Sequence, residues 1–143
     1  MYNILVHAHS GLRWIVLVLL ILAIANAFKG KTYEKKHKML NLFTMISMHT
    51  QLLIGLILYF ISPNVQFSEG WMKNALLRFY GMEHFVGMLA AIIVVTIGRK
   101  IAEKQSDDLA KHAKIKVWYT IALLLILAFI PWPFRANLGA GWF

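Results

Sequence analysis

The sequence predicts an all-α integral membrane protein whose four helices form an up-down-up-down bundle. Hydrophobic residues make up 59% of the 143 residues and charged residues only 15%, which leaves too little polar surface to cover a soluble domain of this size. Four apolar runs alternate with short polar segments, and the positive charge is concentrated in two of those segments. A chain of this length has room for one domain, so residues 1–143 are expected to form a single transmembrane unit.

Each apolar run is interpreted as one membrane-spanning helix. About 20 consecutive apolar residues cross the hydrocarbon core of a bilayer, and a single span satisfies its own backbone there only as a helix. The first three runs reach this length; the fourth is shorter, but aromatic residues such as Trp118 and Trp132 lie at its two ends. Pro63 ends the second run. The expected helices cover residues 4–28, 39–61, 75–98 and 115–130.

Lysine and arginine residues orient the expected helices. Five lysines lie between the first and second runs, and six basic residues lie between the third and fourth. The connection from Ser62 to Asn74 carries one lysine, and no lysine or arginine precedes the first run. The positive-inside rule therefore places both basic loops in the cytoplasm and both termini in the periplasm, across a bacterial cytoplasmic (inner) membrane. On this interpretation the basic residues are topological signals, so the expected partner is the lipid bilayer and not nucleic acid.

A small set of polar side chains falls inside the predicted spans. Ionisable groups are costly in a bilayer and usually face the interior of a helix bundle, which makes each one a functional candidate. With a rise of about 1.5 Å per residue, all of them lie in the outer half of the membrane or near its midplane. They are His9 and Arg13 in the first helix, His49 and Gln51 in the second, and Glu83 and His84 in the third.

Arg13 needs an anionic partner at this depth, because a guanidinium group does not deprotonate in proteins. Glu83 lies at about the same level, so one expectation is a buried ion pair that joins the first helix to the third. The other expectation is that Arg13 contacts a carboxylate or propionate of a bound cofactor. His9 precedes Arg13 by four residues and shares its helix face.

Three histidines on three helices at compatible depths indicate a b-type haem. Such a haem takes two opposed imidazoles without a covalent link, and the absence of cysteine excludes covalently attached haem and iron–sulfur clusters. We expect His84 as one axial ligand, with His49 opposite and His9 as the substitute. Gly81 and Gly87 flank His84 three residues away on each side, which leaves space for a macrocycle or, alternatively, for close helix packing. One haem is expected, because the fourth span carries no histidine.

Several segments resemble those of a known family. The chain resembles, over nearly its whole length, a family of small four-span membrane proteins of Bacteroidetes that is labelled cytochrome b-like; the matching segments are His7–Trp14, His49–Leu56, Glu83-His84 and Pro131–Arg135. This resemblance implies a haem at His9, His49 and His84. The chain is also similar to the HemJ-type protoporphyrinogen oxidase, a small four-helix haem protein with a histidine and an arginine in its first helix. That family uses a lysine in its third helix, and here the third span has none.

Three functions remain open on the residues alone. The leading hypothesis is electron transfer by a haem-binding protein within or beside a respiratory-chain complex. A second is a haem-free structural or assembly subunit of a larger membrane complex, in which the histidines bond neighbouring helices. A third is a membrane oxidoreductase that acts on a quinone or porphyrin and uses Arg13 and a histidine. A bare metal ion is a further alternative, with the ligand set His9, His49, His84 and Glu83.

Overall fold

The computed structural model describes all residues from 1 to 143, and it contains helices and loops but no strand. The long helices are α1 (Tyr2–Lys29), α2 (Lys35–Ile61), α4 (His84–Glu103) and α5 (Asp108–Phe129). Four short elements complete the chain: the 3-10 turn η1 (Trp71–Lys73), α3 (Ala75–Arg78), the π-turn η2 (Phe79–Glu83) and the 3-10 turn η3 (Ala136–Leu138). α3, η2 and α4 follow one another without a break and form one helical span, Ala75–Glu103.

The four spans are confirmed as helices that are long and apolar enough to cross a membrane, but three of them begin earlier than expected. α5 begins at Asp108, seven residues before the apolar run, because the side chain of Asp107 accepts a hydrogen bond from the Ala110 N–H at 2.8 Å. α2 begins at Lys35 after a capping box in which the Glu34 N–H donates to His37 Nδ1 at 3.0 Å. Hydropathy marks the part of a helix that can lie in lipid, whereas the caps set where the helix begins.

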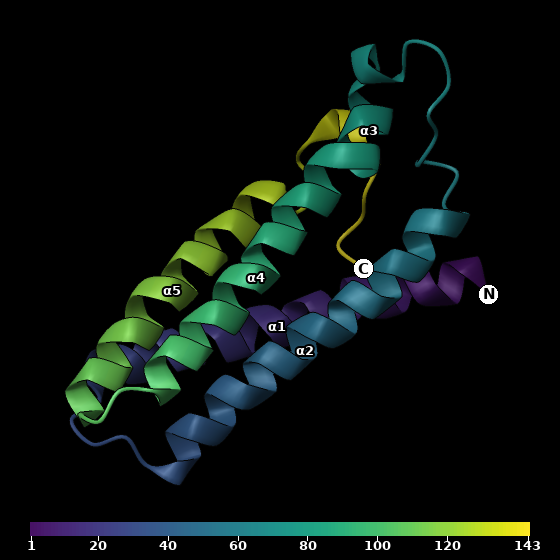
Figure 1. Cartoon of the computed structure of the whole chain (residues 1–143). Helices are drawn as coiled ribbons and strands as arrows, with labels where there is room; N and C mark the ends of the chain where they lie inside the picture. Colours follow the sequence, from purple (N-terminus) through teal and green to yellow (C-terminus); the bar gives the residue numbers. More distant parts are fainter.

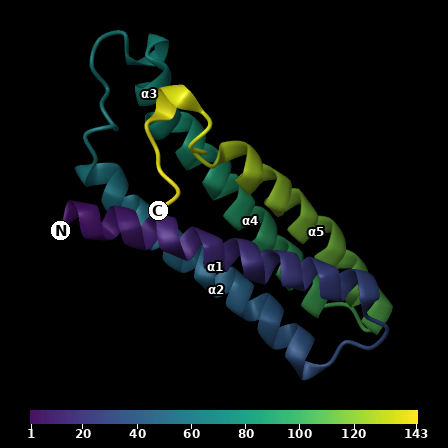
Figure 2. The ribbon, with the colours of Figure 1, turned by 180° about the vertical axis from the view of Figure 1, so that it is seen from behind.

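The long helices pack as two pairs. α1 lies along α2, and α4 lies along α5, with α1 also contacting α5 (Figure 1). The pairs lie together at the end that carries the two basic loops, and they diverge toward the end that carries both chain termini. The same divergence is visible from behind, where the C-terminal segment enters the space between the pairs (Figure 2). The two helix pairs are therefore close together at one end of the molecule, the closed end, and separated at the other, the open end.

Two glycines of α4 let α5 approach closely. A Cβ atom built on Gly98 would overlap the side chain of Trp118, and one built on Gly87 would overlap the ring of Phe129. Small residues let helix backbones approach in this way when lipid offers no hydrophobic drive for association. Gly87 thus takes the close-packing role that the sequence left as the alternative to a place beside a macrocycle.

A chain of hydrogen bonds joins the helices at the closed end. The Tyr119 hydroxyl of α5 donates to the Asn41 carbonyl of α2 at 2.8 Å, and Asn41 Nδ2 donates to the Tyr33 hydroxyl at 2.9 Å. The Tyr33 hydroxyl in turn donates to Glu103 Oε1 of α4 at 2.8 Å. Burial raises the pKa of Tyr33 above its ordinary value, so the hydroxyl keeps its proton and its role as donor at neutral pH.

The glycine contacts predict opposite effects for two matched substitutions. Gly98→Ala places a methyl group against Trp118 and should destabilise the fold by about 1–3 kcal/mol. Gly11→Ala, also within a long helix, meets no atom within 4 Å and should stabilise it by about 0.5–1 kcal/mol. Unfolding of both variants in one detergent, followed by circular dichroism, measures the two shifts. Shifts of equal sign would contradict the close approach at Gly98.

Candidate functional site

A cavity of about 350 Å³ lies between the two helix pairs, toward the end at which they diverge. Its walls are mostly apolar and come from α1, α2, α4, the end of α5 and the C-terminal segment. Its volume falls in the range of small-molecule and cofactor sites, which are typically apolar with a few polar groups. The polar groups that line it inside the spans include His9, Arg13, Gln51, Tyr80 and His84.

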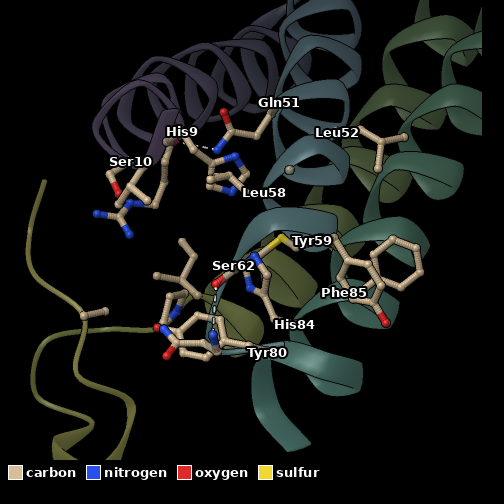
Figure 3. Close-up of a pocket in the computed structure, with 18 of the residues that line it drawn as sticks. His9, Ser10, Gln51, Leu52, Leu58, Tyr59, Ser62, Tyr80, His84 and Phe85 are labelled. Carbon is tan, nitrogen blue, oxygen red and sulfur yellow. Dashed lines mark hydrogen bonds between the residues drawn. The ribbon is translucent and has the colours of Figure 1, made fainter. Parts of the chain in front are cut away.

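Two histidines face each other across this cavity. His9 of α1 and His84 of α4 point toward one another in Figure 3, and their ring centroids lie 6.2 Å apart with the ring planes at 71°. His84 Nδ1 lies 2.7 Å from the Phe129 carbonyl oxygen of α5, while His9 Nδ1 is buried without a hydrogen-bond partner. Gly55 of α2 leaves room for the His9 ring, since a Cβ there would lie 3.1 Å from its Cε1 atom. Each ring therefore has a nitrogen that no protein group occupies.

His49 lies outside the cavity, at the contact between α2 and α4. Its Nδ1 atom lies 2.7 Å from the Met45 carbonyl oxygen one turn earlier in the same helix. Its Nε2 atom lies 3.4 Å from Thr96 Oγ1 of α4. The structure thus brings together His84 and His9, the substitute in the sequence-based prediction, and places His49 on a different face of α2 from Gly55 and Gln51.

Arg13 lines the cavity and bonds the C-terminal segment. Its Nη2 atom donates to the Trp142 carbonyl oxygen at 2.7 Å, while its Nε atom is buried without a partner. Gln51 of α2 donates from Nε2 to the His9 carbonyl oxygen at 2.7 Å, and its Oε1 atom is also buried without a partner. Three residues that line the cavity, His9, Arg13 and Gln51, thus each have an unpartnered buried polar atom, which is expected of a polar ligand site and not of a closed core.

The expected ion pair between Arg13 and Glu83 is wrong. Glu83 Oε1 instead accepts a hydrogen bond from Arg78 Nε at 2.6 Å within the same span. Arg78 and Glu83 lie five positions apart across the π-turn η2, so Arg78 is nearer to Glu83 than Arg13 is. Arg13 is left without a carboxylate partner.

The π-turn also explains why Gly81 does not lie beside His84 in the cavity. The His84 N–H bonds the Phe79 carbonyl oxygen, five residues back, so one extra residue enters the turn. The α-helical spacing that predicted Gly81 and His84 on one face therefore does not apply in this turn. Gly81 faces Trp71 and Phe67, and its carbonyl accepts a hydrogen bond from the Tyr59 hydroxyl at 2.8 Å.

The C-terminal segment is the part of the site that the sequence did not indicate. Residues Gly139, Ala140, Gly141 and Phe143 line the cavity. Trp142 stacks on Trp14 of α1 with ring centroids 6.3 Å apart, and Trp14 Nε1 donates to the Trp142 carbonyl at 3.1 Å. No local sequence pattern reports a contact with a helix more than 120 residues earlier.

The structure does not bring together the ligand set of the bare-metal alternative. No group of three or more histidine, aspartate or glutamate side chains is positioned to hold a metal ion. His49 lies on another face of the bundle, and Glu83 pairs with Arg78. No protein-family model, curated protein or solved structure matches this chain.

Removal of the Arg13 side chain should loosen the C-terminal segment. Arg13→Met deletes one of the two hydrogen bonds to the Trp142 carbonyl, and a bond from a charged donor contributes about 1.5–3 kcal/mol. We expect hydrogen–deuterium exchange in residues 136–143 to become at least about tenfold faster. Arg99→Met, near the opposite end of its span, is the control and should leave this exchange unchanged. Equal exchange in Arg13→Met and the unmodified chain would contradict the anchoring role.

Proposed function

We propose that this chain is a small integral membrane haem protein of b type that transfers electrons within or beside a respiratory-chain complex. The observation that carries the proposal is the pair His9 and His84, which face each other across an apolar cavity. The ring centroids of His9 and His84 lie 6.2 Å apart, and these two histidines would hold the haem between α1 and α4.

The surrounding residues fit such a group. Hydrogen bonding of His84 Nδ1 to the Phe129 carbonyl leaves Nε2 without a proton in the neutral ring. Ligating histidines usually hold their other nitrogen in this way. Arg13, with Nε unpartnered, would bind a propionate, in keeping with its lack of a protein carboxylate. A bound haem would supply a one-electron iron couple, and the apolar walls would keep water from it.

The membrane placement follows from the distribution of charge. We place both basic loops in the cytoplasm and both termini in the periplasm, with the four spans running up, down, up and down through a bacterial inner membrane. Both basic loops lie at the closed end of the molecule (Figure 1). The cavity then opens toward the periplasmic half of the bilayer.

The same cavity supports one alternative, a membrane oxidoreductase that acts on a quinone or porphyrin. The unpartnered Arg13 Nε and His9 Nδ1 would then bind an anionic or carbonyl group of the substrate. These atoms favour either ligand-binding function over a haem-free structural subunit, in which buried polar groups are expected to be paired.

Spectra of the purified chain test the haem proposal. After expression with sufficient haem, we expect a Soret band and an α-band that sharpens on reduction with dithionite. His84→Ala and His9→Ala should each abolish or greatly reduce the haem content per chain. His49→Ala is the matched control, because it also removes a histidine from a span but leaves the cavity intact, and it should retain the spectrum.

Two results would contradict the proposal. A colourless preparation of the folded chain would exclude haem binding, and turnover of a quinol or porphyrinogen that Arg13→Met abolishes would then favour the oxidoreductase. Loss of haem in His49→Ala with retention in His9→Ala would exclude the His9–His84 pair as the ligands.

A further inference from the structure

Two prolines shape the C-terminal end of α5. Pro131 forces the residue before it out of the helical region, and Ile130 is indeed extended, with φ −70° and ψ 133°. In a continuing helix the N–H groups of residues 131 and 133 would bond the carbonyls of Leu127 and Phe129. Proline has no N–H at either position. These two carbonyls therefore have no backbone donor from the chain that follows.

Side chains bond the exposed carbonyls instead. An unbonded carbonyl costs several kcal/mol in a lipid environment, and each of the last three carbonyls of α5 has a side-chain donor. The donor–acceptor pairs are Trp132 Nε1 with Leu127 at 2.9 Å, Arg135 Nη1 with Ala128 at 3.3 Å, and His84 Nδ1 with Phe129 at 2.7 Å. Two of these donors come from the segment Pro131–Arg135 itself, and the third comes from the cavity.

The bond to Phe129 fixes the state of the His84 ring. A carbonyl oxygen only accepts hydrogen bonds, so His84 Nδ1 carries the hydrogen. The neutral ring then keeps a lone pair on Nε2. Gly87, one turn after His84, brings the Phe129 ring against α4, because a Cβ there would overlap that ring. The last turn of α5 is thereby held within reach of His84.

We propose that Pro131 and Pro133 together position His84. Pro131 ends α5 at Ile130, and Pro133 has no N–H that a continuing helix could offer to the Phe129 carbonyl. That oxygen is thereby left to hold His84 as the Nδ1–H tautomer, with Nε2 free to accept a bond in the cavity. The tautomer depends only on residues of this chain. The use of Nε2 as an axial ligand rests on the proposed haem function.

Nitrogen-15 NMR of the histidine rings tests the tautomer without haem. The full-length chain, labelled at histidine and prepared in detergent without haem, should give a protonated Nδ1 and an unprotonated Nε2 for His84. The signals are assigned by their loss in His84→Gln. A ring protonated at Nε2 and not at Nδ1 would overturn the proposal.

Two variants test the role of the two prolines. Pro131→Ala with Pro133→Ala allows α5 to continue, so the new N–H at 133 competes for the Phe129 carbonyl. We expect a mixture of His84 tautomers and about a tenfold loss of haem affinity, the lower end of what removal of such a supporting contact costs. Pro131→Ala alone is the control: Pro133 still lacks a donor, so the Nδ1–H tautomer should persist. An unchanged tautomer in the double variant would overturn the proposal.

A second variant covers the case in which the double variant does not fold. Gly87→Ala displaces the Phe129 ring and should lengthen the hydrogen bond to His84, again giving mixed tautomers. A single Nδ1–H tautomer in this variant would show that the bond to Phe129 does not set the tautomer, and would overturn the proposal. The two proposals fail separately. An Nδ1–H tautomer in a chain that binds no haem would overturn the proposed function and support the positioning role, whereas haem binding with the other tautomer would do the reverse.

Discussion

The hydrogen bonds that run from Tyr119 through Asn41 and Tyr33 to Glu103 hold three helices and a loop together at one end of the molecule. Because this end is closed, the two helix pairs can separate at the other end without the bundle losing its register. The glycine contacts reinforce this asymmetry, since they hold α4 on α5 along the whole pair while α2 packs more loosely on α4. The cavity is the space that remains because one pair is tight and the two pairs diverge away from their closed end.

Arg13 is a charged residue at the open end, where it lines the cavity and bonds the C-terminal segment. It is buried, it faces the cavity, and no carboxylate approaches it. The Trp142 carbonyl supplies a dipole and not a charge, so the guanidinium group keeps an unmet demand for an anion. Since the carbonyl belongs to a terminal segment that packs mainly through aromatic side chains, an anionic ligand could displace it without unfolding a helix.

The sequence predicted the spans because lipid imposes the same requirement on every helix, whatever its neighbours. It also selected four residues that line the cavity, His9, Arg13, Gln51 and His84, since depth depends only on position along a helix. Depth does not fix rotation about the axis, which is why His49 was expected opposite His84, with His9 only as the substitute, while only His9 lines the cavity. The Arg13–Glu83 pair failed for a different reason, because the π-turn brought Arg78 to Glu83. A single extra residue in one turn moves the residues around it to other faces of the helix, and the amino-acid composition does not reveal this change.

The end of α5 connects these local requirements to the site. A helix that stops at a proline within reach of lipid must find donors for its last carbonyls, and the chain supplies an indole, a guanidinium group and an imidazole. Only the imidazole comes from a residue that also lines the cavity. The hydrogen bond that satisfies the Phe129 carbonyl is therefore the same one that places the hydrogen on Nδ1 of the His84 ring. A histidine held by a carbonyl for purely structural reasons would have the same tautomer, but it would not need His9 opposite it with an unpartnered nitrogen. That second ring, and not the bond to Phe129, is what distinguishes a ligand site from a helix cap.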